Sequence, residues 1–383
     1  MISEKGPEAA SPSRDHNGRI HLTNKIENMA TKRGRRFPRL GRREIALFLL
    51  ACGCVFLLFS VPSRSEVLKP VSAKSRDESK PRVDSTTIFD SPQSTTGCGR
   101  IPPVTPGTSG EGTLVSGGLT RSYLLHIPRA YDLSHLYPLV LNFHGHGSTA
   151  LHQAQITGFS RLADSLGFIV AYPQGSFGPR NLTGWSSGGP NQPDTNDVLF
   201  VSNLLNTLQS ELCIDPTRIY ATGFSNGGGL TSVLACTLAR RIAAFASVSG
   251  SYYPLASGCD PDRAVPILEF HGTADRTVPY SGRSKQHELG AMAWLGTWAA
   301  RDGCASTPRE FLKTAAVTGL EWRGCLDDAV VIHYRLNGGV HVWPDQLGTP
   351  RLPVSDRSID ATRVIWEFFM MHPLPGGVKA IET

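Results

Sequence analysis

The chain has 383 residues and a formal net charge of +6. This positive charge belongs to an N-terminal tail, because residues 1–43 hold 11 Lys and Arg against 4 Asp and Glu. The remaining residues are close to neutral, so the overall charge does not support a nucleic-acid-binding function.

An uncharged apolar run follows the tail at residues 45–61, with arginines before it and Pro62 after it. Its length is just sufficient to span a membrane, which takes about 17–25 residues, and the positive flank directs the following chain out of the cytoplasm. Two interpretations remain open. The segment 44–61 is either the signal anchor of a type II membrane protein or the core of a cleaved signal peptide, with Met1 or Met29 as the start. We expect export with eventual release, and membrane contact only through this segment.

Residues 62–96 are rich in Ser, Pro, Lys, Asp and Thr and have few large apolar side chains. Such a composition cannot support a core and predicts a disordered linker. The composition of the sequence changes at residue 97, and the length of residues 97–383 is that of one large α/β domain.

Strand-like and helix-like runs alternate through this domain. Strand patterns occur at residues 121–127, 139–143, 168–173, 218–222, 245–249, 265–270 and 330–336. Helical patterns occur at residues 158–166, 198–212 and 364–369. Repeated β-then-α units predict an α/β fold whose mostly parallel central sheet is covered by helices on both faces.

The strand at residues 218–222 runs directly into a G-x-S-x-G pentapeptide at 223–227, and a helix-compatible run follows. The pentapeptide alone is a weak signal, but this strand–turn–helix context is that of the nucleophile elbow of α/β-hydrolases. We therefore predict that Ser225 is a catalytic nucleophile.

Candidate partners follow in the order that an α/β-hydrolase requires, Asp275 and then His341. Each residue comes just after a predicted strand. Ser225 needs an imidazole to take its proton, and the imidazole needs a carboxylate to hold its tautomer. A single Asp or His in a loop is usually a turn former, but three such residues at strand ends predict a Ser-Asp-His triad.

The strand at residues 139–143 runs into His144-Gly145-His146-Gly147. In α/β-hydrolases an oxyanion hole combines an amide from such a loop with the amide after the nucleophile. We predict that the amides of His146 and Asn226 form it. A metal site at His144 and His146 is the alternative, but no third ligand stands at a recognised spacing, so we expect no metal.

Eight cysteines are present, two of them in the apolar segment. The other six are Cys98, Cys213, Cys236, Cys259, Cys304 and Cys325. An even number without C-x-x-C pairs favours disulfides in an oxidising compartment. Cys236 with Cys259 and Cys304 with Cys325 are the natural local pairs, which leaves Cys98 with Cys213, although six cysteines permit 15 connectivities.

The loop at residues 175–193 is rich in Gly, Pro and aromatic residues, and loops at this edge of the sheet build substrate clefts. Trp185 is a candidate substrate-binding residue, or else it fills the core of the loop. Asn181 begins the sequon Asn-Leu-Thr and is a candidate glycosylation site. Asp197 caps a helix or holds a neighbouring loop.

Several motifs recur in this order in one known family. They lie at residues 97–99, 116–123, 143–145, 172–175, 213–223 and 270–275. On these motifs residues 97–372 resemble the fungal secreted feruloyl esterases of the type C group, within the wider esterase family that includes bacterial polyhydroxybutyrate depolymerases. The resemblance implies ester hydrolysis on plant cell-wall hydroxycinnamates without a cofactor, and Ser225, Asp275 and His341 match the family triad. Two features depart from the family: the basic tail, and residues 283–287 beside the acid.

We therefore predict a serine carboxylic ester hydrolase, a monomeric feruloyl esterase that acts on hydroxycinnamoylated arabinoxylan. Acetylxylan esterase and polyhydroxybutyrate-type polyester depolymerase remain alternatives among hydrolases. The alternative outside them is a catalytically dead wall-surface binding protein, which the intact set of Ser225, Asp275 and His341 argues against.

Overall fold

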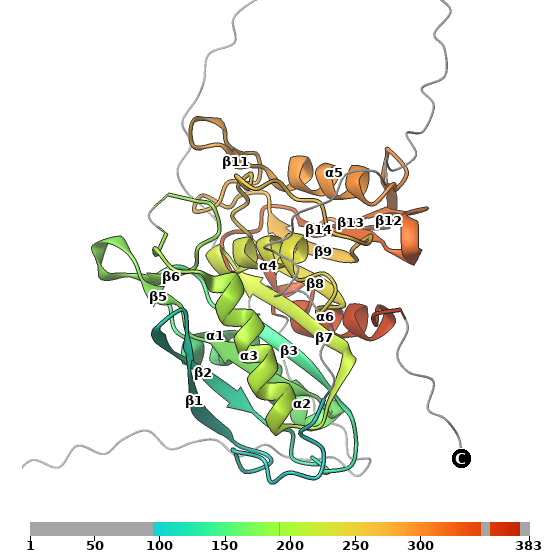
Figure 1. Cartoon of the computed structure of the whole chain (residues 1–383). Coiled ribbons are helices and arrows are strands. Elements are labelled where there is room, and N and C mark those ends of the chain that lie inside the picture. The colour runs from blue at the N-terminus through green and yellow to red at the C-terminus, as the bar shows by residue number, and fades with distance from the viewer. Residues whose placement is uncertain (1–94, 191, 346–352, 376–383) are drawn as a thin grey trace, which may run out of the picture. The chain divides into compact units, whose positions relative to one another are not determined.

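A computed structural model describes residues 95–190, 192–345 and 353–375 (Figure 1). The predicted tail, apolar segment and nearly all of the predicted linker lie outside these residues. Within the described ranges, no helix has both the length and the apolar character needed to cross a membrane.

A ten-stranded sheet runs through the domain. In spatial order its strands are β1 (Ser109–Ser116), β2 (Leu119–His126), β4 (Ile169–Pro173), β3 (Tyr137–Phe143), β7 (Ile214–Phe224), β8 (Ala244–Val248), β9 (Ile267–Gly272), β14 (Val331–Leu336), β13 (Val317–Trp322) and β12 (Arg309–Lys313). The strands from β4 to β14 are parallel, and antiparallel strands form both edges. The predicted α/β-hydrolase fold with a mostly parallel sheet is confirmed.

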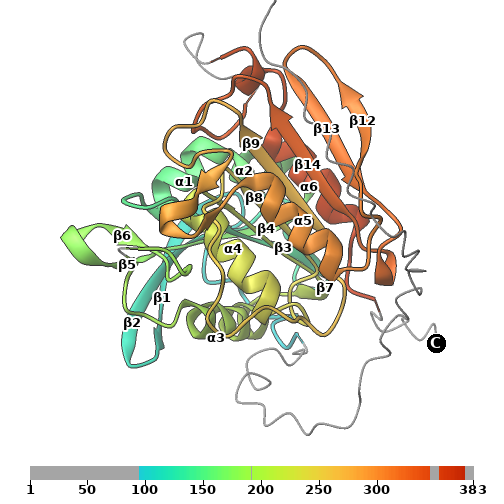
Figure 2. The ribbon, with the colours of Figure 1, turned by 90° about the horizontal axis from the view of Figure 1, so that it is seen from above.

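Helices cover both faces of the sheet. One face carries α3 (Asp197–Glu211), α4 (Asn226–Thr237) and α5 (Ala291–Arg301), and the other carries α1 (Ala150–Thr157), α2 (Phe159–Leu166) and α6 (Ala361–Met371). Figure 2 shows α4 and α5 in front of the strands. Each helix set packs on its own apolar cluster, because successive side chains of a strand point to opposite faces.

Strand β3 illustrates this division. Leu139, Leu141 and Phe143 join the cluster under α3, α4 and α5, and Val140 joins the cluster under α1, α2 and α6. All seven residues of β3 are buried. A central parallel strand covered on both faces therefore reads as a continuous apolar run.

Smaller elements lie in the loops. They are the strand pairs β5 (Ser176–Phe177) with β6 (Thr183–Gly184) and β10 (Gly282–Arg283) with β11 (Glu288–Leu289), and the 3₁₀ helices η1 (Pro179–Asn181), η2 (Ser284–Gln286), η3 (Leu326–Asp328) and η4 (Ser355–Arg357). The hairpin of β5 and β6 projects from the body of the domain in both views (Figures 1 and 2). It carries Asn181, which is exposed on η1.

Three disulfides join Cys98 to Cys213, Cys236 to Cys259, and Cys304 to Cys325. These are the local pairs expected from the sequence and the pair left over from them. The first bridge is the longest in sequence and spans 115 residues. It attaches the start of the described domain to the entrance of β7.

Candidate active site

Ser225 lies in the turn between β7 and α4. Its backbone has φ 57° and ψ −117°, a conformation that residues other than glycine rarely adopt. A Cβ added to Gly223 would collide with the carbonyl of Gly227, and a Cβ added to Gly227 would collide with the carbonyl of Phe143. The two glycines of the pentapeptide therefore permit the tight turn that holds Ser225 in its strained conformation.

Asp275 and His341 meet at the adjoining strand ends. The Nδ1 atom of His341 lies 2.7 Å from Oδ2 of Asp275. Oδ1 of Asp275 accepts the backbone N–H groups of Thr277 and Val278, each at 2.8 Å. Burial opposes ionisation of Asp275, but its hydrogen bonds with His271 and His341 outweigh burial and lower its pKa. The carboxylate is thus ionised and fixed against the imidazole.

Packing places His341 beside the nucleophile turn. The ring centroid of His341 lies 4.7 Å from that of Phe224, the residue before Ser225. The loop that carries His341 is held by Asp356, whose Oδ2 accepts the N–H of Val340 at 3.1 Å. The structure therefore brings the three predicted triad residues to one edge of the sheet.

The loop after β3 lies against the nucleophile. A Cβ added to Gly145 would lie 3.3 Å from Cβ of Ser225. The next residue is His146, and Asn226 is the first residue of α4. In the part of the chain that the structure describes, the backbone N–H of neither residue donates a hydrogen bond. An oxyanion hole requires two such unpaired amides, so both predicted donors are free for that role.

The buried side chain of His144 fixes this loop from behind. Its Nε2 accepts the N–H of Gly175 at 2.9 Å and lies 3.1 Å from Nε2 of Gln174, while its Nδ1 lies 2.7 Å from the carbonyl oxygen of Gly145. Burial lowers the pKa of His144 to about 4, so the ring is neutral. Its accepting nitrogen is occupied by protein donors, which opposes the alternative of a metal ligand. Among the described residues no cluster of His, Cys, Asp and Glu could hold a metal ion.

Trp185 is fully buried. Its indole N–H donates to the carbonyl of His144 at 2.8 Å, and its ring contacts the rings of Phe143 and His144. The side chain thus occupies the core of the loop, the second of the two roles that the sequence left open. A fully buried ring is not available to a substrate in this conformation.

The side chain of Asn226 has a role that the sequence did not indicate. Its Oδ1 accepts the N–H of Trp185 at 2.8 Å, and its Nδ2 donates to Oγ of Ser187 at 2.8 Å. Asp197 holds the same loop, because its Oδ2 accepts the N–H of Ser186 at 2.7 Å while its Oδ1 binds Arg121. The loop at residues 185–187 is therefore anchored both to the nucleophile helix and to α3.

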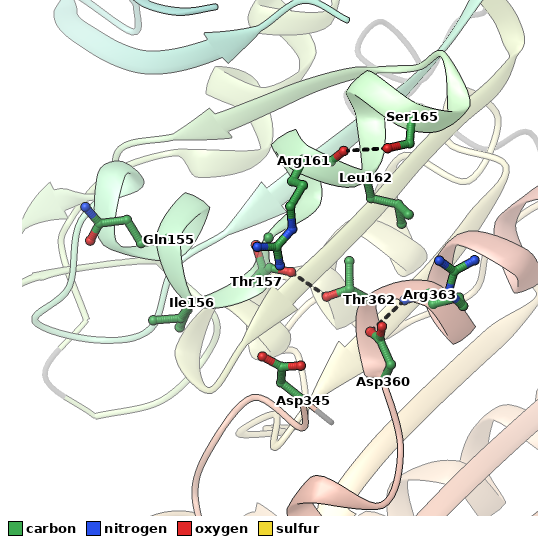
Figure 3. A pocket seen from close by; sticks show the side chains of 11 residues that line it. Gln155, Ile156, Thr157, Arg161, Leu162, Ser165, Asp345, Asp360, Thr362 and Arg363 are labelled. Atoms are coloured by element: carbon green, nitrogen blue, oxygen red, sulfur yellow. Dashed lines mark hydrogen bonds between the residues drawn. The ribbon is translucent and has the colours of Figure 1, made fainter. Parts of the chain in front are cut away.

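One pocket lies away from these residues. It has a volume of about 290 Å³ between α1, α2 and α6, and its polar lining includes Arg161, Asp345, Asp360 and Arg363. Figure 3 shows Arg161 and Asp360 coming from opposite sides of this space. None of the predicted site residues lines it, so it is separate from the candidate active site.

Comparisons with known proteins agree with this geometry. The family described as Esterase PHB depolymerase matches residues 121–260. Feruloyl esterase B of Piromyces equi is 32% identical over 238 residues, which cover 59% of this chain and 43% of that protein. Feruloyl esterase C of Emericella nidulans is 29% identical over 283 residues, which cover 72% of this chain and 90% of that protein.

A third relative is a bifunctional acetylxylan esterase/xylanase of Neocallimastix patriciarum, 36% identical over 156 residues that cover 41% of this chain and 22% of that protein. The chain thus spans less than half of the first and third relatives and most of the second. The strand order of the sheet and the turn at Ser225 are those expected of an esterase with the α/β-hydrolase fold. Residues 121–260 are therefore similar to the Esterase PHB depolymerase family, and the chain as a whole is similar to the fungal feruloyl esterases.

Proposed function

We propose that the protein is a serine esterase that releases hydroxycinnamic acids from esterified plant cell-wall polysaccharide, with Ser225, Asp275 and His341 as its catalytic triad. The observation that carries this proposal is the 2.7 Å contact between His341 and Asp275 beside the strained Ser225. A strained backbone conformation costs free energy and is typical of functional positions, so the strain at Ser225 favours a catalytic role over a purely structural one.

The reaction begins when Oγ of Ser225 attacks the ester carbonyl carbon. Nε2 of His341 takes the serine proton, and the Asp275 carboxylate stabilises the resulting imidazolium through Nδ1. The backbone N–H groups of His146 and Asn226 donate to the developing oxyanion, and each such donor accounts for about 10²–10³ in rate. When the tetrahedral intermediate collapses, the bond to the sugar oxygen breaks and His341 protonates that oxygen.

Water then repeats the sequence on the acyl-enzyme. His341 takes a proton from the water, whose oxygen attacks the acyl carbon while the same amides hold the oxyanion. The bond to Oγ of Ser225 breaks, His341 returns the proton to Oγ, and the free acid leaves. All proton transfers are assigned to His341, so these residues complete the cycle without a cofactor.

The names of the relatives support the substrate class. Two of the three are feruloyl esterases, and the third includes acetylxylan esterase activity. Acetylxylan is therefore the second candidate substrate. A polyester of hydroxybutyrate follows from the family description alone. The three disulfides support action outside the cytoplasm.

The experiment compares hydrolysis of methyl ferulate, methyl caffeate, acetylxylan and hydroxybutyrate oligomers by the wild type and by Ser225→Ala. We expect the hydroxycinnamate esters to be cleaved fastest, and we expect Ser225→Ala to lose several orders of magnitude in kcat, because triad residues act as a unit.

The matched control is Ser210→Ala, an exposed serine at the end of α3. It should retain wild-type rates. If Ser225→Ala keeps more than roughly a tenth of the activity, a loss below about 1.4 kcal/mol, the triad is refuted. If acetylxylan is cleaved fastest, the acetylxylan alternative replaces the feruloyl one.

A further inference from the structure

A series of buried polar side chains leads from Asp275 into the sheet. Strand β9 carries Glu269 and His271 on the same face, and both side chains are almost completely buried. The neighbouring strand β14 places the buried His333 directly opposite Glu269. None of these three residues takes part in the proton transfers proposed above, and burying charged groups is costly unless they are paired.

Both ring nitrogens of His271 face acceptors. Nδ1 lies 2.9 Å from Oε1 of Glu269. Nε2 lies 2.8 Å from the carbonyl oxygen of Val278 and 3.5 Å from Oδ2 of Asp275. A carbonyl oxygen cannot donate a hydrogen bond, and neither can an ionised carboxylate. These contacts are therefore satisfied together when both nitrogens carry a proton, which makes the ring an imidazolium.

His333 contacts the same carboxylate but has a different second neighbour. Its Nδ1 lies 2.7 Å from Oε2 of Glu269, and its Nε2 lies 2.9 Å from the hydroxyl of Tyr280. Burial raises the pKa of Tyr280, so the hydroxyl keeps its proton and can donate it to Nε2. His333 thus needs only one proton of its own to satisfy both contacts.

The electrostatics agree with this assignment. Burial opposes the charge on His271, but its hydrogen bonds with Asp275 and Glu269 outweigh burial and raise its pKa to about 10. Burial likewise opposes ionisation of Glu269, and the nearby His333 and His271 lower its pKa. The cluster therefore holds two carboxylates and one fixed imidazolium.

Other titratable or charged groups border this cluster. They are Tyr252 from the loop after β8, Tyr280 from the loop after β9, Arg335 of β14 opposite His271, and, on the far side of Asp275, His341 and Asp356. Arg335 donates to Asn337 and Thr318. His271 is the cation that contacts both Glu269 and Asp275.

We propose that His271 is a positioning residue. It is an imidazolium fixed between Glu269 and Asp275, and it keeps the Asp275 carboxylate ionised and oriented. Its charge thereby sets the acid limb of the pH–rate profile. The inference rests on the proposed triad, in which His341 must be neutral to act as a base. His271 and His341 contact the same oxygen of Asp275, at 3.5 Å and 2.7 Å, so their nearest nitrogens are close enough for like charges to oppose each other. The fixed charge therefore opposes a second positive charge beside Asp275 and extends activity to lower pH.

The variant His271→Gln tests this directly, because the amide can still donate toward Val278 but carries no charge. We expect the acid-side midpoint of its kcat/KM profile to rise by about one pH unit, while kcat on the alkaline plateau falls less than about tenfold. The matched control His333→Gln disturbs the same Glu269 without removing the fixed charge, and its midpoint should stay at the wild-type value. Equal shifts in both variants, or no shift in His271→Gln, would overturn the proposal.

A second measurement does not depend on the folding of the two histidine variants. In the full chain of Ser225→Ala labelled with ¹⁵N-histidine, both ring nitrogens of His271 should be protonated from about pH 6 to about pH 8. A neutral tautomer at about pH 7 refutes the inference. The two proposals fail separately: an active Ser225→Ala contradicts the triad, whereas an inactive Ser225→Ala together with an unshifted His271→Gln contradicts only the role of His271.

Discussion

Asp302 is a buried carboxylate distant in sequence from the candidate triad. It follows the last residue of α5, and its Oδ1 accepts the N–H of Val265 at 3.1 Å. Its Oδ2 has no hydrogen-bond partner among the described residues. Burial raises the pKa of Asp302 to about 7, against the smaller lowering effects of the Val265 N–H and of Arg301 and Arg263.

This shift makes stability depend on pH. The folded pKa is above the unfolded one, so between about pH 4 and about pH 7 the folded chain holds a proton that the unfolded chain has released. The contribution of Asp302 to the free energy of unfolding is complete below about pH 4 and is lost as the pH rises through about pH 7. We expect Asp302→Asn, which keeps the acceptor and cannot ionise, to be more stable than wild type at about pH 8 by about 1–3 kcal/mol.

Denaturant unfolding at several pH values measures this effect. The exposed Asp328→Asn on η3 serves as the control, since its pH dependence should match that of the wild type. Parallel stability curves for wild type and Asp302→Asn across this range would contradict the expectation.

The roles of some residues in the candidate site could be predicted from the sequence, and the roles of others could not. Ser225, Asp275 and His341 could be proposed because each follows a strand, and the chemistry of a nucleophile requires the other two. The hydrogen bonds of His144 and the side-chain contacts of Asn226 could not be predicted, because their partners Gly175 and Trp185 come from a loop that the fold brings near. His271 lies in the motif at residues 270–275, but its charge could not be predicted, because it follows from the contact of its Nε2 with the carbonyl oxygen of Val278.

At the level of elements, the sequence predicted the parallel strands but missed the helices α1 and α5 and the antiparallel strands β1, β12 and β13. Strands such as β3 are continuous apolar runs, and this pattern is typical of a strand that is buried on both faces. Helix α1 lacks a clear apolar face, since Leu151 is exposed while Gln153 is buried. Its start depends on Thr149, whose Oγ1 accepts the N–H of His152, and Gly158 with φ 65° separates it from α2. The sequence pattern therefore indicated only the second of these two helices.

The disulfides differ in the length of chain that they close. Cys98–Cys213 spans 115 residues and Cys304–Cys325 spans 21. The entropy that a bridge removes from the unfolded chain grows with the logarithm of loop length. We expect the double variant Cys98→Ser/Cys213→Ser to lose about 1.5 kcal/mol more stability than Cys304→Ser/Cys325→Ser. Denaturant unfolding under non-reducing conditions gives both values, and the reverse ranking would contradict this account.

At the scale of the whole molecule, the N-terminal segments remain predictions, because they lie outside the described residues. We propose that residues 1–43 stay cytoplasmic, that the apolar segment directs export, and that the domain from residue 97 is released as a soluble, glycosylated monomer. The supporting observation is the even set of bridged cysteines in the described domain, which suits an oxidising compartment.

N-terminal sequencing of the protein from culture medium tests the release. We expect a start within residues 62–96, because a segment of that composition is accessible to proteases. Activity that remains with membranes after carbonate extraction, together with an intact basic tail, would instead establish the type II anchor. Activity found only in the cytosol would exclude both.

The attachment of the first described residues has a mechanical consequence. The N–H groups of Thr96 and Gly97 both donate to the carbonyl of Gln209, and Cys98 is bridged to Cys213. Tension applied through the preceding chain therefore passes across a covalent bond into the junction of α3 and β7, in the middle of the fold. The edge strands β1 and β2 are bypassed and cannot be peeled away one hydrogen bond at a time. A domain pulled from this end should resist force far better than one pulled through β1 itself.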